Sequence, residues 1–145
     1  MHKDQQNRVE LAIEQLHIAI DLFLTGRSFV SALTLAGAAD EVLGRKAERF
    51  GTKKTISVQY EVITKLLEKL QREAPTFKEF AKERNETRNA VKHMAPDAEE
   101  FFIANLASEA VAKIGSACNN YENCGLPLTD KMREFTGWYL GEPSV

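Results

Sequence analysis

The sequence predicts an all-α fold, an antiparallel bundle of four to five helices within one domain spanning residues 1–145. Three observations lead to this prediction. Apolar residues recur three and four positions apart along five stretches, which is the period of one helix face. Capping residues, glycine and proline mark where most of these stretches begin and end. No stretch of any length shows the alternation expected of a β-strand.

The first two helices are predicted over residues 4–24 and 28–50. The first has an apolar face at helical spacing, formed by Val9, Ala12, Ile13, Leu16, Ala19, Ile20 and Phe23. Gly26 supplies the turn that ends it, and Ser28 caps the next helix. The centre of the second helix, Leu35-Ala-Gly-Ala-Ala39, has almost no side-chain bulk, so another element can approach closely. Either a partner within the chain or a second copy of the protein would fill that groove.

Two further helices are predicted, over residues 57–73 and from Thr76 to about residue 95. The earlier one carries an apolar stripe formed by Val58, Val62, Leu66 and Leu70. Thr76 and Glu79 have the spacing of a capping box at the start of the later one. Pro96 disfavours helical geometry in the residue before it. We therefore expect His93 to lie in the last helical turn.

The last third of the chain is predicted to contain a fifth helix and a C-terminal extension. Asp97 and Glu100 have the spacing of a capping box, and the helix that they open fades near residue 121. The extension, about residues 123–145, is expected to pack on the bundle and to include a short helix over residues 130–135. Its apolar end would cover the open end of the bundle or contact a second subunit, through Trp138, Tyr139 and Leu140.

Composition limits the classes of function. The formal net charge of −2 argues against a broad, non-specific nucleic-acid binder, which is normally basic, but is compatible with a local basic face. Cys118 and Cys124 are too few for a disulfide scaffold and are expected to be reduced. The sequence has no secretion signal and no apolar run of about 18 residues, so we expect a cytoplasmic protein without a membrane segment.

A basic cluster follows the second predicted helix, formed by Arg45, Lys46, Arg49, Lys53 and Lys54. Cations are favourable near the C-terminal end of a helix, so the cluster is expected to be a solvated helix end. The functional alternative is a rim that guides RNA.

The residues best suited to chemistry lie near the end of the fourth predicted helix, between Arg84 and His93. At about 100° per residue, Arg84, Arg88, Asn89 and His93 share roughly one side of the helix. An imidazole beside permanent cations suits chemistry at a phosphate. The alternative is a solvated face on which the arginines form salt bridges with Glu83, Glu86, Asp40 or Glu41.

The stretch Arg88-Asn89-Ala90-Val91-Lys92-His93 resembles the Arg-Asn-x3-His form of the signature of HEPN domains. The small-residue helix from Ser31 to Gly44 is similar to an early helix of that family. The resemblance implies a metal-independent endoribonuclease that acts as a homodimer, leaves a cyclic phosphate and serves as a toxin or defence component. It also implies a small nucleotidyltransferase antitoxin as a partner.

Carried over to this chain, the resemblance implies a role for each motif residue. Arg88 would bind and stabilise the scissile phosphate, His93 would be the acid and base, and Asn89 would orient the imidazole or the phosphate. Helical geometry adds Arg84 and Lys92 as further contacts to the substrate. One histidine does not comfortably perform both proton transfers of RNA cleavage, so two copies of this helix are expected to form a composite site.

Two other functions remain open. One is a non-catalytic HEPN-like module that binds nucleotide or RNA or dimerises, and the other is a helical interaction domain that regulates a partner enzyme. Glu14 and His17 have the Glu-x-x-His spacing of di-iron bundles, but those sites need a second such motif. We therefore expect no metal and no other cofactor.

Overall fold

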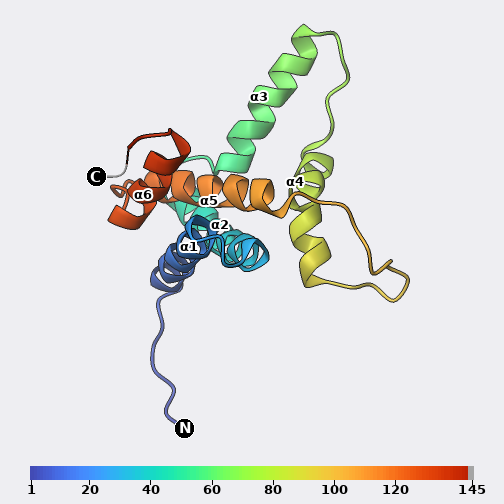
Figure 1. Ribbon diagram of the computed structural model, residues 1–145. Coiled ribbons are helices and arrows are strands. Elements are labelled where there is room, and N and C mark those ends of the chain that lie inside the picture. The colour runs from blue at the N-terminus through green and yellow to red at the C-terminus, as the bar shows by residue number, and fades with distance from the viewer. Residues whose placement is uncertain (144–145) are drawn as a thin grey trace.

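A computed structural model describes residues 1–143, and over these residues the chain forms six helices and no strand (Figure 1). The helices are α1 (Arg8–Leu24), α2 (Phe29–Phe50), α3 (Thr55–Lys69), α4 (Phe77–Lys92), α5 (Leu106–Asn123) and α6 (Asp130–Tyr139). The predicted all-α class is confirmed. No helix in this part of the chain has the length and apolar character needed to cross a bilayer.

The tightly packed core lies where α2 contacts α1 on one side and α5 on the other. Its largest fully buried side chains come from four helices and are Leu16, Ile20, Leu33, Leu43, Ile114 and Met132. The small residues of α2 are buried here, which allows its neighbours to approach closely. Helices α3 and α4 project to one side of this core, so the compact bundle is smaller than the sequence predicts (Figure 1).

The C-terminal extension packs on the core through α6. Phe23 of α1 contacts two aromatic rings of α6, with ring centroids 6.2 Å from Phe135 and 4.9 Å from Trp138. Edge-on aromatic contacts of this kind are favourable in addition to the area that they bury. The helix extends to Tyr139, four residues beyond the predicted end. Residues 144–145 of the predicted extension lie outside the described residues.

Helix ends differ from the prediction where a local cap decides the boundary. Helix α1 begins at Arg8 and not at residue 4, because the Asn7 side chain accepts hydrogen bonds from the next turn. Helix α3 begins two residues early, at Thr55, and ends at Lys69, since Gln71 takes a left-handed conformation with φ 55°. Helix α4 begins with the predicted Thr76–Glu79 capping box.

The predicted start of the fifth helix is wrong. The capping box at Asp97 and Glu100 does not open a helix, and α5 begins at Leu106, where the Asn105 side chain accepts a 3.0 Å hydrogen bond from the Ser108 amide. Residues 93–105 form a connection that carries Phe101, Phe102 and Ile103 at the surface. Three adjacent apolar residues do not share one helix face, so amphipathic packing does not favour a helix there.

Candidate functional site

Arg88 of α4 is buried against the centre of α2. Only 5% of the residue is exposed, although it carries a permanent charge. Its side chain crosses Gly37, where a Cβ atom would overlap Arg88 Nε and Cδ. The shallow centre of α2 is therefore filled within the chain, and Gly37 is the residue that makes room for the arginine.

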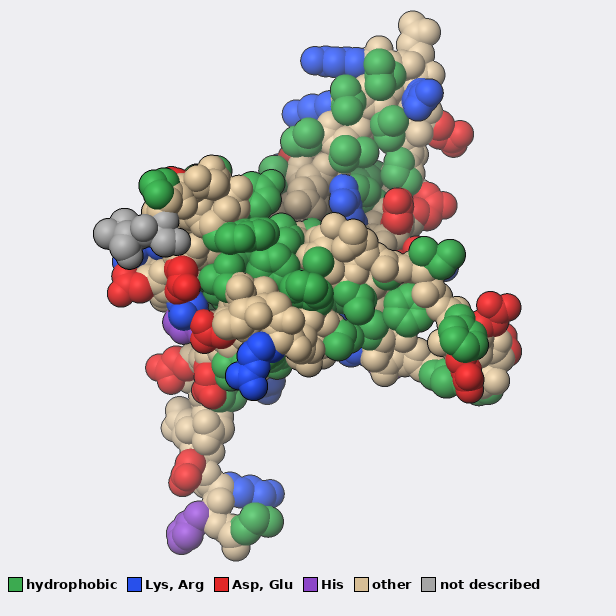
Figure 2. Space-filling model, viewed as in Figure 1, with side chains coloured by type: hydrophobic (Ala, Val, Ile, Leu, Met, Phe, Trp, Pro, Cys, Tyr) green, Lys and Arg blue, Asp and Glu red, His purple; other side chains and the backbone are tan. Residues whose placement is uncertain are grey.

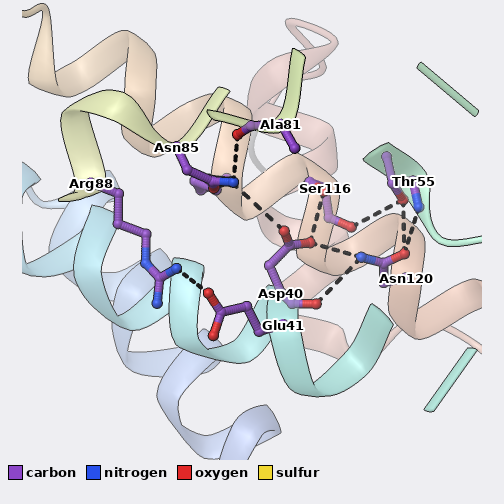
Figure 3. Close-up of polar contacts among 9 residues, drawn as sticks. Asp40, Glu41, Thr55, Ala81, Asn85, Arg88, Ser116 and Asn120 are labelled. Atoms are coloured by element: carbon purple, nitrogen blue, oxygen red, sulfur yellow. Dashed lines mark hydrogen bonds and ion pairs between the residues drawn. The ribbon is translucent and has the colours of Figure 1, made fainter. Parts of the chain in front are cut away.

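The Arg88 guanidinium forms an ion pair with Glu41 of α2, from Nη1 to Oε1 (Figure 3). The Glu41 side chain is 66% exposed, so the pair joins a buried cation to a carboxylate at the surface. Arg88 Nε has no hydrogen-bond partner among the described residues. The salt bridge that the sequence offered as the alternative is thus present for Arg88, and an incoming phosphate would have to displace or share Glu41.

A second polar group surrounds Asp40, one residue before Glu41 (Figure 3). Asp40 Oδ1 accepts 2.7 Å hydrogen bonds from Ser116 Oγ and from Asn120 Nδ2, both on α5. Asn120 Oδ1 in turn accepts hydrogen bonds from the Thr55 amide and hydroxyl, at 2.8 and 3.0 Å. These contacts fasten the start of α3 to α2 and α5 through groups that are satisfied inside the fold.

Lys113 connects this group to α4. Its Nζ donates a 2.7 Å hydrogen bond to Asn85 Oδ1 and lies 3.9 Å from Asp40 Oδ2. Burial raises the pKa of Asp40, and burial lowers the pKa of Lys113, each against the opposing attraction of the other. Desolvation therefore outweighs pairing for both groups, as expected for a separation wider than a normal hydrogen bond.

The other predicted site residues lie at the surface. Arg84 is placed over the Phe80 ring, with 5.0 Å from Cζ to the ring centroid. Asn89, Lys92 and His93 are exposed. His93 is the C-cap of α4 with extended backbone at φ −131° and ψ 140°, so the prediction that it lies inside the last helical turn is wrong. Pro96 restricts the backbone of Ala95, the residue before it, but the chain is already extended two residues earlier, at His93.

The structure thus separates the motif into a buried arginine and an exposed histidine. Arg88 faces α2 and Glu41, while Asn89, Lys92 and His93 face solvent at the end of α4. Sequence reasoning missed the group around Asp40. A signal was present, because Lys113, Ser116 and Asn120 recur three and four positions apart along an otherwise apolar helix face.

The Glu14–His17 pair is not part of a metal-ligand cluster in the described chain, where no three histidine, cysteine or acidic residues converge. His17 Nε2 instead lies 2.8 Å from Thr129 Oγ1, the residue that caps α6. The contact ties α1 to the start of α6.

Helix α3 and the 93–105 connection leave a large apolar surface uncovered. The predicted stripe of α3 faces outward, with Val62 59% exposed and Leu70 58% exposed, and Phe101 and Ile103 are more exposed still. Figure 2 shows hydrophobic side chains along the projecting α3. The accessible surface of 10396 Å² compares with about 7,500 Å² for a compact monomer of 16.3 kDa.

This excess of surface is large enough to form an interface. The difference of roughly 2,900 Å² exceeds the roughly 800 Å² per partner that a standard interface buries, even though the extended residues 1–7 contribute to it. Exposed apolar residues gathered on one part of a surface, as on α3 and the 93–105 connection, are typical of interaction sites.

Comparison of the chain with protein-family models, with curated proteins and with solved structures gives no match.

Proposed function

We propose that the protein is a HEPN-like, metal-independent endoribonuclease that acts as a homodimer. The observation that carries the proposal is the exposed end of α4, where Asn89, Lys92 and His93 are all accessible to a substrate. This end leads directly into the 93–105 connection, which has apolar side chains available for a second subunit. A copy of the chain docked there would bring a second His93 toward the first.

The chemistry follows from what RNA cleavage needs. One imidazole takes the proton of the 2′-hydroxyl, and the other gives a proton to the departing 5′-oxygen. The 2′-oxygen forms a bond to phosphorus as the 5′-oxygen leaves, so the product carries a 2′,3′-cyclic phosphate. Lys92 and Asn89 lie on the same end of α4 as His93 and would hold the phosphate oxygens.

Arg88 has a conditional role in this proposal. Its Nη1 is held by Glu41, whose carboxylate is largely exposed and can be replaced by a phosphate oxygen. Replacing Glu41 with glutamine removes the competing charge, so Glu41→Gln is expected to lower KM for RNA if Arg88 binds phosphate. A purely structural Arg88 would show a loss of stability in Glu41→Gln with KM unchanged.

The experiment that tests the proposal is RNA cleavage by purified protein in the presence of EDTA. His93→Ala is expected to abolish cleavage, while His2→Ala, which changes an exposed histidine near the N-terminus, is expected to cleave at the wild-type rate. Circular dichroism should show equal helix content in all three proteins. Equal cleavage by wild type and His93→Ala would refute the proposal.

The burial of Arg88 favours a second candidate, a non-catalytic HEPN-like module that binds RNA or nucleotide, or dimerises, and regulates a partner protein. An arginine that is 5% exposed and paired within the subunit is well placed to position α4 on α2, independently of any reaction. RNA binding without cleavage at any concentration of protein would support this module over the nuclease.

The biological setting that we propose is a toxin or defence component held inactive by a small nucleotidyltransferase antitoxin. The uncovered apolar surface of α3 is available to such a partner. Expression of the chain alone should then arrest growth, and His93→Ala should relieve the arrest.

A further inference from the structure

A cleft of about 580 Å³ lies beside the core; Glu41 is among its lining residues, whereas Arg88 and His93 are not. It is formed by the start of α1, the second half of α2, the start of α3, the first half of α4 and residues of α5. The volume is within the range of small-molecule sites, roughly 300–1,000 Å³. Two carboxylates line it, against six cations, which are Arg8, Arg45, Lys46, Arg49, Lys54 and Lys113. This excess is opposite in sign to the net charge of the chain, −2.

Three of these cations lack an acidic partner. Lys54 and Arg45 share Glu48, at 3.0 and 3.5 Å. Arg8, Lys46 and Arg49 have no carboxylate within 4 Å in the described part of the chain. Cations gathered in a concave surface reinforce one another's potential, which attracts an anion.

The helix dipole does not account for this cluster. A cation near the end of α2, such as Arg49, is favoured by the dipole of that helix. Arg8, however, is the first residue of α1, where the dipole disfavours a cation. Two helices with opposite electrical preferences therefore contribute cations to one cleft, and a shared anionic ligand explains both.

One wall of the cleft suits an aromatic ligand group. Phe77 is 39% exposed and forms an aromatic wall beside Lys54, whose Nζ lies 6.0 Å from the ring centroid. Asp40, Asn85 and Asn120 also line the cleft, with side chains already hydrogen-bonded within the fold. An aromatic ring next to phosphate-binding cations is the combination that recognises a base and its phosphates.

We propose that this cleft binds a nucleoside phosphate, with the phosphates at Arg8, Lys46 and Arg49 and the base against Phe77. The phosphate can belong to a free nucleotide or to one nucleotide of an RNA strand, since the recognising groups are the same. The proposal does not depend on ribonuclease activity, because neither Arg88 nor His93 lines the cleft.

The test is titration calorimetry on the His93→Ala protein, so that no probe is consumed. The probes are ATP, inorganic pyrophosphate and a single-stranded RNA of about ten nucleotides. ATP is expected to bind one site per chain, and Arg49→Ala and Lys46→Ala are each expected to weaken it by about tenfold. Arg27→Ala is the matched control, because it removes an exposed arginine at the opposite end of α2 and should leave ATP affinity unchanged.

Two further measurements identify which part of the nucleotide is bound and whether it comes from a free nucleotide or from RNA. Phe77→Leu should weaken ATP and leave pyrophosphate unchanged, which separates base stacking from phosphate binding and from loss of fold. RNA that competes with ATP for the site identifies a strand as the source of the nucleotide, and RNA that does not compete identifies a free nucleotide.

The proposal is overturned if ATP does not bind at millimolar concentration, or if Arg27→Ala weakens ATP binding as much as Arg49→Ala does. Because no cleavage is measured, either result leaves the proposed nuclease activity standing, and loss of cleavage in His93→Ala leaves this site standing.

Discussion

Gly37 offers a sharp test of how α4 is held on the core. In most helix interiors, replacing glycine with alanine is stabilising by up to about 1 kcal/mol, because glycine loses more backbone freedom on folding. At Gly37 the new Cβ would overlap Arg88 Nε and Cδ, so the buried guanidinium must move away from Glu41. We therefore expect Gly37→Ala to destabilise the protein, against the local preference of the helix.

The magnitude follows from two opposing effects. Overpacking of a closely fitted site costs about 1–3 kcal/mol, and the gain in helix propensity offsets about 1 kcal/mol of it. The net loss for Gly37→Ala is then between about 0 and 2 kcal/mol. Gly115 of α5 is the matched control, since a Cβ there meets no atom within 4 Å. Gly115→Ala is expected to be stabilising by up to about 1 kcal/mol.

The assay is urea unfolding followed by circular dichroism for both alanine variants, in wild-type and Arg88→Ala backgrounds. Without the Arg88 side chain the overlap disappears, so Gly37→Ala should become stabilising, with a coupling energy of about 1–3 kcal/mol. If Gly37→Ala stabilises the wild-type background as much as Gly115→Ala does, Arg88 does not lie across α2 and the reasoning is wrong.

Three further predictions concern burial and the uncovered surface. Burial lowers the pKa of Lys113 below its ordinary 10.5, so between the folded and the ordinary pKa the folded state binds fewer protons than the unfolded state. The free energy of unfolding should therefore rise with pH in that range. Urea unfolding of Lys113→Met should lack this rise. Burial raises the pKa of Cys118 to about 12, so its thiol should not react with a disulfide reagent at pH 8 until the protein is unfolded. Ile103→Glu in the 93–105 connection should lower the mass measured by light scattering to that of one chain, and a dimer that persists in this variant places the interface elsewhere.

The sequence predicts α1, α2 and the start of α4 well because their signals are local. The spacing of apolar residues is sufficient to predict that α1 exists, although the Asn7 cap sets its start at Arg8, and Ser28 and Thr76 cap helices as predicted. The start of α5 could not be predicted in the same way. Two caps compete there, and the choice of Asn105 over Asp97 depends on whether Phe101 and its neighbours find a surface to cover.

The residues of the candidate site could be named from the sequence, but their burial and their contacts with distant parts of the chain could not. The motif runs from Arg88 in α4 to His93 at the C-cap of that helix, but the burial of Arg88 depends on Gly37, which is distant in the chain. The basic cluster after α2 was visible in the sequence, whereas Arg8 joins it only through the pairing of α1 with α2. Long-range placement of this kind leaves no periodic signal in a single sequence.

The central claim is that cleavage needs one His93 from each of two subunits, and subunit mixing tests it most directly. Wild-type protein is unfolded and refolded with a tenfold excess of His93→Ala, and RNA cleavage in EDTA is measured per wild-type subunit. Random pairing leaves only about one wild-type subunit in ten with a wild-type partner, so activity per wild-type subunit should fall about tenfold. Activity that stays constant per wild-type subunit would show that one chain cleaves alone and would contradict the composite site.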